Sequence, residues 1–249
     1  MRQMARAGIG DRVEGFHAVA AAVQAGRAKT VRIEQRRLNR PTYTALADDA
    51  RAGGARVEYV DDVRDIALTS APQGVVAMCR PKEIVSLEDA VAATDPAALL
   101  VFDHLEDQRN LGAAIRSAVA AGFRAVVVPK RRSAPIGAAA FKAAAGTLEE
   151  VALVEVSSIP EALRRLEKLG VWRVGLDGAG ERSLFGFDLL SEPVAVVVGA
   201  EGKGLHRLTA ERCDAIVRIP HAGPAESLNA SVATALAVFE VSRARGWVS

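Results

Sequence analysis

The stretch VAVVVGAEGKG, residues 194–204, places five apolar residues directly before a loop that contains three glycines. An uninterrupted apolar run of this length suits a strand of a parallel sheet, because such strands are buried on both faces. Glycine allows a backbone to approach a ligand closely. Ligands of open parallel sheets bind beyond the carboxyl ends of the strands. The stretch therefore predicts a parallel α/β fold with a candidate binding loop at 199–204.

This loop matches neither of two common nucleotide-binding patterns. Its glycines are Gly199, Gly202 and Gly204, which is not the G-x-G-x-x-G order, and no G-K-[ST] follows at P-loop spacing. Glu201 stands between them and can accept a hydrogen bond from a ligand hydroxyl or hold an arginine. A plain tight turn is the alternative to a ligand-binding loop.

Strands and helices alternate along most of the chain. After a loose tail at 1–11, residues 12–82 predict a small α/β domain, 83–96 a helical linker, and 97–249 a larger α/β domain. Strands of the larger domain are expected at 98–103, 124–128, 150–156, 171–177, 194–198 and 214–219. Helices are expected between them at 111–121, 135–145, 159–169, 205–211 and 227–245.

The composition indicates a globular protein without disulfides or a metal site. Of the 249 residues, 50% are hydrophobic and 25% charged, which is ordinary for a soluble domain. Cys79 and Cys213 are far apart, so a reduced, cytoplasmic setting is expected. No signal-peptide pattern and no membrane-length apolar run is present, so we expect no membrane association. The four histidines are scattered, at His17, His104, His206 and His221.

Positive charge is concentrated near the start of the chain. Residues 1–82 hold 14 Lys or Arg and 9 Asp or Glu, although the net charge of the whole chain is only +2. A basic domain of this kind favours a polyanionic partner such as RNA. The alternative is a small basic domain with no such partner.

The segment RNLGAAIRSA, residues 109–118, predicts a helix that begins after Asn110 and carries an arginine among small residues. Arg116 lies off the apolar stripe, and helical side chains lean toward the helix N-terminus. The small neighbours at 112 and 113 leave room for the guanidinium to reach the helix start. An anion there, such as a phosphate or an oxyanion, would offset its charge. A salt bridge to Asp103 or Glu106 is the alternative.

A third segment, AGPAESLNASVATALAVFEV at 222–241, runs from turn residues into a helix that is apolar on nearly every face. Such a helix is buried in a core or in a subunit interface. Ser227 and Asn229 stand at its entry, where Ser and Asn often serve as caps. Capping accounts comfortably for one of these two polar side chains, so the pair is a candidate ligand contact.

Together, DxxNLGAAIRSA, VVVGAEGKGL and IPHAGPAESLNASVATAL resemble, in this order, the three motifs of the SpoU (TrmH-type) RNA 2′-O-ribose methyltransferases of the SPOUT superfamily. The resemblance covers about residues 98–245. The first part, with GFHAVAAAV at 15–23 and APQGVVAMCRP at 71–81, resembles the L30e-like RNA substrate-binding domain attached to this family. The pairing is most similar to bacterial enzymes that methylate a guanosine ribose of 23S rRNA.

This resemblance implies a trefoil-knotted SPOUT methyltransferase domain, a homodimer with the last helix at or near the interface, and S-adenosylmethionine bound in the knot. The implied cofactor-binding residues are Gly199, Ala200, Glu201, Gly202, Ile219 and Leu228. The implied catalytic residues are Asn110, Arg116, Glu201, Ser227 and Asn229. Gln108 replaces the proline usual in the first motif and Ala230 the valine usual in the third, and neither contributes a reacting group.

Two features of the implied reaction stay open. Arginine is sometimes proposed as the base in this family, but a guanidinium stays protonated in proteins. We therefore expect Arg116 to bind the adjacent phosphate and stabilise the developing 2′-oxyanion. The target could instead be a tRNA, or an rRNA adenosine as in antibiotic-resistance enzymes. A non-catalytic knotted RNA-binding protein is a further alternative, whereas the glycine order disfavours a nicotinamide-dependent oxidoreductase.

Overall fold

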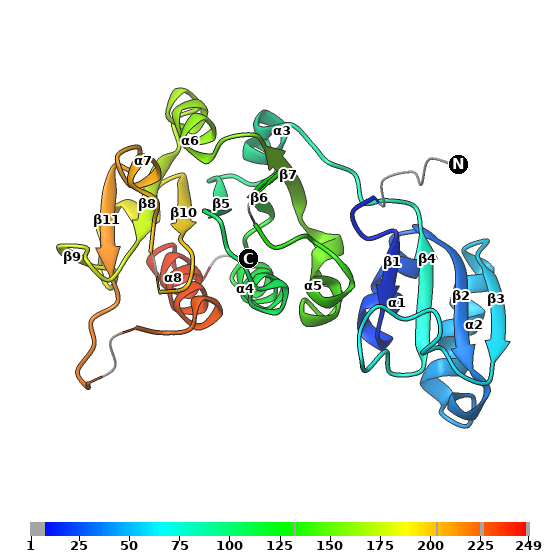
Figure 1. The fold of residues 1–249 in the computed structure, drawn as a ribbon. Coiled ribbons are helices and arrows are strands. Elements are labelled where there is room, and N and C mark those ends of the chain that lie inside the picture. Colours follow the sequence, from blue (N-terminus) through cyan, green and yellow to red (C-terminus); the bar gives the residue numbers. More distant parts are fainter. Residues whose placement is uncertain (1–7, 132, 203, 225–226, 248–249) are drawn as a thin grey trace, which may run out of the picture. The chain divides into compact units, whose positions relative to one another are not determined.

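The computed structural model describes residues 8–131, 133–202, 204–224 and 227–247. The predicted loose tail therefore lies mostly outside the described residues. The chain forms two compact units, drawn with their elements labelled in Figure 1. Unit 1 comprises the described residues up to Glu83 together with Pro135–Glu149, and unit 2 comprises Ile84–Ala134 and the residues from Glu150 onward.

Unit 1 contains a four-stranded sheet in the order β1-β4-β2-β3, in which β2 and β3 are parallel and β4 is antiparallel to its neighbours. Its strands are β1 (Arg12–Glu14), β2 (Ala28–Glu34), β3 (Arg56–Val60) and β4 (Val75–Cys79). Its helices are α1 (Phe16–Gln24), the 3-10 turn η1 (Gln35–Arg37), α2 (Pro41–Ala52), α5 (Ala138–Ala143) and η2 (Thr147–Glu150).

The segment 135–149 packs within unit 1, although it is distant in sequence from the rest of that unit. A Cβ added at Gly10 would lie 2.3 Å from the ring of Phe141, so the ring rests directly on this glycine. The Arg27 guanidinium lies 5.5 Å from the centre of the same ring and pairs with Glu149 at 2.6 Å. From the sequence, the helix expected at 135–145 was assigned to the larger domain, 97–249, whereas in the structure it packs within unit 1. Its contacts there span more than 100 residues, so no local pattern indicated them.

Unit 2 is built on a seven-stranded sheet in the order β7-β6-β5-β10-β8-β11-β9, and its paired strands are all parallel. The strands are β5 (Ala98–Phe102), β6 (Ala125–Pro129), β7 (Ala152–Val156), β8 (Trp172–Leu176), β9 (Arg182–Ser183), β10 (Val194–Val198) and β11 (Ala215–Arg218). The helices are α3 (Leu87–Ala92), α4 (Gln108–Ala120), α6 (Ile159–Lys168), η3 (Asp188–Ser191), α7 (Arg207–Ala210) and α8 (Ala230–Ala244). The predicted parallel α/β sheet is confirmed, whereas the two-residue β9 and the η3 turn were not expected.

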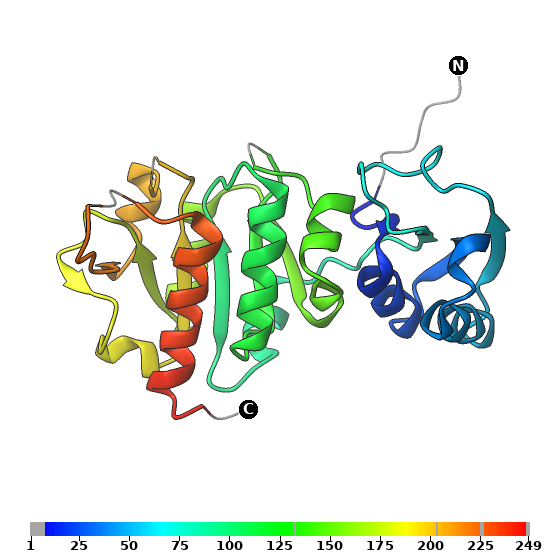
Figure 2. The same ribbon diagram turned by 90° about the horizontal axis from the view of Figure 1, so that it is seen from below.

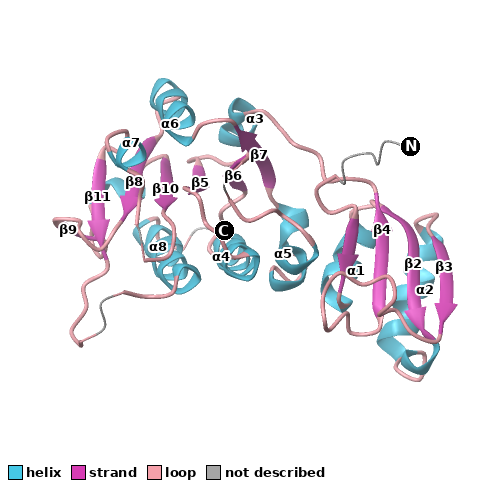
Figure 3. Ribbon diagram, viewed as in Figure 1, coloured by secondary structure: helices cyan, strands magenta, loops and turns pink. Residues whose placement is uncertain are grey.

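Helices cover both faces of this sheet, as Figure 3 shows. On one face α4 and α8 lie side by side (Figure 2), and on the other α3 packs against β5, β6 and β7 while α6 packs against β8. Sandwiched strands need apolar residues on both faces, and every residue of β5, β6 and β10 is buried. Among the described helices, none is long and apolar enough to cross a membrane.

Candidate active site

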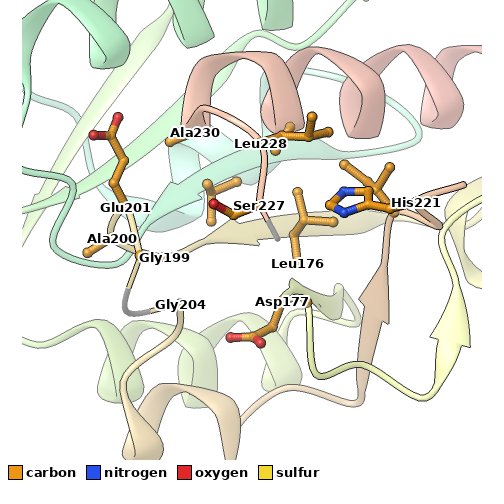
Figure 4. Close-up of a pocket in the computed structure, with 15 residues that line it drawn as sticks. Leu176, Asp177, Gly199, Ala200, Glu201, Gly204, His221, Ser227, Leu228 and Ala230 are labelled. Atoms are coloured by element: carbon orange, nitrogen blue, oxygen red, sulfur yellow. The ribbon is translucent and has the colours of Figure 1, made fainter. Parts of the chain in front are cut away.

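The carboxyl ends of β8, β10 and β11 and the start of α8 surround a cavity of about 320 Å³, here called the strand-end cavity (Figure 4). It lies where open parallel sheets bind ligands. The residues that line it include the six predicted cofactor-binding residues Gly199, Ala200, Glu201, Gly202, Ile219 and Leu228, and also the predicted catalytic residue Ser227.

The glycine loop folds back on itself in a way that needs glycine. The amide of Ala200 donates to the carbonyl of Gly204 at 3.1 Å, and the amide of Gly204 donates to the carbonyl of Ala200 at 3.0 Å. A Cβ added at Gly199 would lie 2.1 Å from the Gly204 carbonyl oxygen. Gly202 and Gly204 have φ values of +70° and +64°, a region that other residues rarely adopt. The glycines thus close a compact backbone cradle on one side of the cavity.

Two carboxylates from the strands on either side of β10 hold the end of this loop. Asp177, directly after β8, accepts a hydrogen bond from the Leu205 amide at 3.0 Å. Asp103, directly after β5 and fully buried, accepts one from the next amide, that of His206, at 2.8 Å. Charge-assisted bonds of this kind are among the stronger ones in proteins. We infer that Asp103 and Asp177 fix the loop in the shape that bounds the cavity.

Asp103 also lies against two imidazole rings. Its carboxylate is 2.6 Å from His104 Nδ1 and 3.2 Å from His206 Nδ1, and the ring centroids are 4.3 Å apart. The three side chains could place metal-ligand atoms within 4.8 Å of one another. The carboxylate is already bonded to the His206 amide and to both rings, so we interpret the cluster as a hydrogen-bonded anchor for the start of α7.

Three of the five predicted catalytic residues form a hydrogen-bonded chain at the rim of the cavity. The Asn110 amide nitrogen donates to the Glu201 carboxylate, and the Asn229 amide nitrogen donates to the Asn110 side-chain oxygen at 3.2 Å. The Asn229 oxygen accepts from the Ser231 amide at 2.9 Å and so caps α8. The first, second and third motifs therefore meet here, as their positions after strand ends predicted.

The start of α4 differs from the prediction. The helix begins at Gln108, so Asn110 lies inside its first turn, because Asp107 is the N-cap. The Asp107 carboxylate accepts from the amides of Arg109 at 2.6 Å and Asn110 at 3.2 Å. These two amides at the helix start are therefore already satisfied by a side chain and are not open to a bound anion.

Arg116 is exposed on α4, and it forms no hydrogen bond or ion pair with another residue in the described ranges. The alternative of a salt bridge to Asp103 does not hold, because that buried carboxylate is engaged by His104 and His206. Arg116 does not line the strand-end cavity. Its guanidinium is exposed outside the cavity.

Two family models match this chain in tandem. One, described as RNA 2′-O ribose methyltransferase substrate binding, matches residues 12–85. The other, described as the SpoU rRNA methylase family, matches residues 97–239, which is more than half of the chain.

The chain belongs to the SpoU rRNA methylase family.

Relatives and solved structures agree with this assignment. The chain is 40% identical over 248 residues to the 23S rRNA (guanosine-2′-O-)-methyltransferase RlmB of Xanthomonas campestris, covering 94% of this chain and 96% of that protein. It is 41% identical over 194 residues to RlmB of Escherichia coli, covering 77% and 78%. The SpoU methyltransferase AviRb of Streptomyces viridochromogenes superposes with a TM-score of 0.80 at 25% identity, covering 95% of this chain and 90% of that one. The predicted family is confirmed.

SpoU methylases use S-adenosylmethionine, and AdoMet-bound structures are among those that this chain resembles, from S. viridochromogenes at 25% identity and from Sinorhizobium meliloti at 27%. The strand-end cavity suits this ligand. Its volume falls within the usual range of about 300–1,000 Å³ for small-molecule sites. Apolar side chains of Leu176, Ile219 and Leu228 can cover a purine, while the carboxylates of Asp177 and Glu201 suit a cationic sulfonium and ammonium.

Some residues of this SpoU site were not predicted from the sequence. Leu176, Asp177 and Gly178 line the cavity although β8 carries no recognised motif, and His221 does so from the segment after β11. The available signal was an acid directly after a buried apolar strand, which both Asp103 and Asp177 share. That signal is weak, because such acids also occur in ordinary turns.

Proposed function

We propose that this chain transfers a methyl group from S-adenosylmethionine to the 2′-hydroxyl of a guanosine in 23S rRNA. The observation that carries the proposal is the junction of the three SpoU motifs, where the Glu201–Asn110–Asn229 chain borders the strand-end cavity. Near-full-length relatives at about 40% identity are named as 23S rRNA guanosine methyltransferases. A structure titled for methylation of tRNA matches only 61% of this chain, which favours rRNA as the target.

The cofactor residues proposed are Gly199, Ala200, Glu201, Gly202, Ile219 and Leu228. Bound S-adenosylmethionine would supply the methyl group on a positively charged sulfur. The glycine cradle holds the ligand mainly by backbone, so its position depends on the loop shape that Asp103 and Asp177 maintain. Methyl transfer is an in-line displacement that requires the reacting atoms to be held about 3 Å apart. The rigid cradle supplies one half of that alignment.

The other half comes from residues that face the ribose. Asn110, which accepts a hydrogen bond from Asn229, holds the Glu201 carboxylate at the rim, where it can accept a hydrogen bond from a ribose hydroxyl. Ser227 lines the cavity beside them and can orient the cofactor or the ribose. Arg116, permanently charged and without a described partner, would bind the adjacent phosphate and stabilise negative charge on the 2′-oxygen. The hydroxyl proton would pass to solvent water as the new carbon–oxygen bond replaces the carbon–sulfur bond of the methyl donor.

A homodimer and the family's trefoil knot are part of the proposal. Three large apolar side chains of α8 are exposed: Val232 by 48%, Leu236 by 37% and Phe239 by 39%. They recur at helical spacing on the face opposite the buried one, which is typical of a subunit interface. The knot is supported by the strand order, because β10 lies between β5 and β8 and the chain returns from β11 to place α8 beside α4.

Unit 1 is proposed to be the L30e-like domain that binds the RNA substrate. Deleting residues 1–82 would be a poor test, because it would remove the packing partners of 135–149, among them Arg27 beside Glu149. Single substitutions in unit 1 are therefore the appropriate probe. We propose that the protein acts in the bacterial cytoplasm, where ribosomal RNA is made and modified.

The test is to map ribose methylation across 23S rRNA from cells that lack the gene. We expect one guanosine to lose its 2′-O-methyl group and to regain it when the gene is restored. Purified protein should methylate the same position of unmodified 23S rRNA with S-adenosylmethionine. Unchanged 23S rRNA together with a lost methyl group on a tRNA would move the target to tRNA, and no change in either RNA would contradict the proposal.

A further inference from the structure

A second hollow, in unit 1, shares no lining residue with the strand-end cavity of unit 2. It is a cleft of about 360 Å³, formed where the η1 turn faces the loop from Ser70 to Gly74. Its lining carries three guanidinium groups, those of Arg36, Arg37 and Arg64, and a single carboxylate, that of Glu34. We call it the arginine cleft.

The buried carboxylate of Glu34 holds the arginines of this cleft in place. It is the last residue of β2, and its side chain is only 2% exposed. The carboxylate accepts a hydrogen bond from Arg36 Nε at 2.7 Å, and this bond is the main reason why the pKa of Glu34 lies below its usual value. A buried charge of this kind is stable only when it is paired. Glu34 therefore holds Arg36 at the cleft while leaving its outer nitrogens accessible.

Arg37 is held by packing. Its guanidinium lies 6.0 Å from the centre of the Tyr43 ring, and its Nε is 3.7 Å from the Glu34 carboxylate. On the other side it rests on Gly74, where an added Cβ would lie 2.6 Å from Arg37 Nε. Gly74 also has a φ of +78°, so glycine is required there twice over. The position of Arg37 is thus set before any ligand arrives.

Arg37 donates no side-chain hydrogen bond to another described residue. Its Nε is buried and lacks a hydrogen-bond partner, because the Glu34 carboxylate at 3.7 Å is close enough only for an ion-pair contact. A buried unsatisfied donor calls for an explanation, and a ligand that accepts hydrogen bonds is one. A preordered guanidinium loses little entropy on binding and presents paired donors that match a phosphate. Tyr43 is only 5% exposed, so base stacking on it is excluded.

We propose that the arginine cleft binds backbone phosphates of the RNA substrate through Arg37 and Arg36. This inference rests on the proposed function of the chain as an RNA methyltransferase. The surrounding sequence supports a polyanion, because residues 27–40 hold six Lys or Arg and one Glu. The cleft lining contains no exposed aromatic ring, so the cleft would recognise the charge of the RNA backbone and would not distinguish between bases.

The test uses the full chain and 23S rRNA transcribed in vitro. Arg37→Gln and the double variant Arg36→Gln/Arg37→Gln are compared with Arg51→Gln. Arg51 is the matched control because it also lies in unit 1, yet its guanidinium already donates to Asp48 at 3.0 Å and Tyr59 at 2.6 Å. RNA affinity is measured at several salt concentrations, and S-adenosylmethionine affinity by calorimetry.

We expect Arg37→Gln to weaken RNA binding and to reduce the slope of log K against log salt by about 0.7–0.9, with about twice that change in the double variant. Arg51→Gln should leave the slope unchanged, and S-adenosylmethionine affinity should be the same in all four proteins. Gly74→Ala should reproduce the loss by displacing Arg37. Thermal unfolding shows whether each variant is folded.

An unchanged salt slope in folded Arg37→Gln and in the double variant would overturn the proposal and would direct attention to an acidic protein as the ligand of the cleft. An equal loss in Arg51→Gln would also overturn it, because the effect would then reflect net charge alone. These outcomes are distinct from failure of the proposed function. If the unaltered chain transferred no methyl group to 23S rRNA, the function would fail, while the binding comparison would still report on the cleft.

Discussion

The strand-end cavity of unit 2 and the arginine cleft of unit 1 are suited to their proposed ligands by different means. The cavity is bounded largely by backbone, and no arginine or lysine is found among its described lining residues. The cleft places three guanidinium groups around one buried carboxylate. Shape governs the first site and charge the second. Substitutions at the cavity should therefore change ligand affinity by the same factor at every salt concentration. Substitutions at the cleft should change how steeply RNA affinity falls with salt.

Arg116 is the sharpest challenge to this division, because it is a charged residue of unit 2 that we place at the reacting phosphate. Arg116→Ala should lower kcat by about 10²–10³, the usual cost of losing one donor to a developing oxyanion. Arg116→Lys should lower it less, because the positive charge is kept. Initial rates of methyl transfer with 23S rRNA and S-adenosylmethionine both saturating measure the kcat of both variants.

Salt then separates catalysis from binding. The loss in Arg116→Ala should persist at every salt concentration at which the RNA is saturating, since it arises in the transition state. Near-normal turnover in Arg116→Ala would exclude the proposed role. A defect in Arg116→Ala that disappears at low salt would show that Arg116 acts in RNA binding, as proposed for the arginine cleft, and not in the transition state.

At the cavity, Gly199→Ala should weaken S-adenosylmethionine binding by about 10–100-fold, the equivalent of about 1–3 kcal/mol of overpacking. The added methyl would lie 2.1 Å from the Gly204 carbonyl oxygen and force the cradle open. Gly178→Ala is the matched control, because it lines the same cavity yet its Cβ would meet no atom within 4 Å. Calorimetry at low and high salt measures both variants.

Gly199→Ala and Gly178→Ala should differ in their affinity for S-adenosylmethionine, and in neither variant should that affinity depend on salt. If Gly178→Ala were as damaging as Gly199→Ala, crowding within the loop would not be the cause. A strong salt dependence in Gly199→Ala would mean that charge also governs the cavity.

Much of the cavity was predictable because its determinants are local. The six cofactor residues were assigned by resemblance to motifs, and all six line the cavity. Six of the seven strands of the large sheet followed from apolar runs, which directly report burial on both faces. The glycine loop was predictable because its pairing joins Ala200 to Gly204, only four residues away.

What could not be predicted depends on contacts across the chain. Asp103 meets His206, and Phe141 meets Gly10, over more than 100 residues, so no local pattern reports them. Asp107 was overlooked for another reason: the helix was expected to begin three residues later, which concealed the cap. In the sequence, the arginine cleft was indicated only by the excess of positive charge in residues 1–82. The position of the Arg37 side chain could not be predicted, because it depends on contacts with Gly74 and Tyr43 in other segments.

The smallest expected effect concerns a type of residue that occurs in both units, a buried carboxylate paired with an arginine. Glu240 of α8, like Glu34 of the cleft, is buried, and a hydrogen bond from an arginine, Arg243 at 2.7 Å, is the main cause of its lowered pKa. A folded pKa below the ordinary value of 4.5 stabilises the fold above that pH, and the stability is lost as pH falls through the folded pKa.

At pH 7, Glu240→Gln should therefore reduce the free energy of unfolding of unit 2 by about 1–3 kcal/mol, and the difference from the unaltered chain should shrink as pH falls below 4.5. Urea unfolding followed by tryptophan fluorescence measures this in unit 2, because Trp172 and Trp247, the two tryptophans of the chain, both belong to it. A difference that stays constant from pH 7 into the acid range would show that the Gly186 amide, 2.8 Å from the carboxylate, matters more than its charge. In that event the contribution of Glu240 to stability would come from burial and hydrogen-bond geometry and not from its ionisation. Shape would then matter more than charge along α8, as it does in the strand-end cavity beside the N-terminus of that helix.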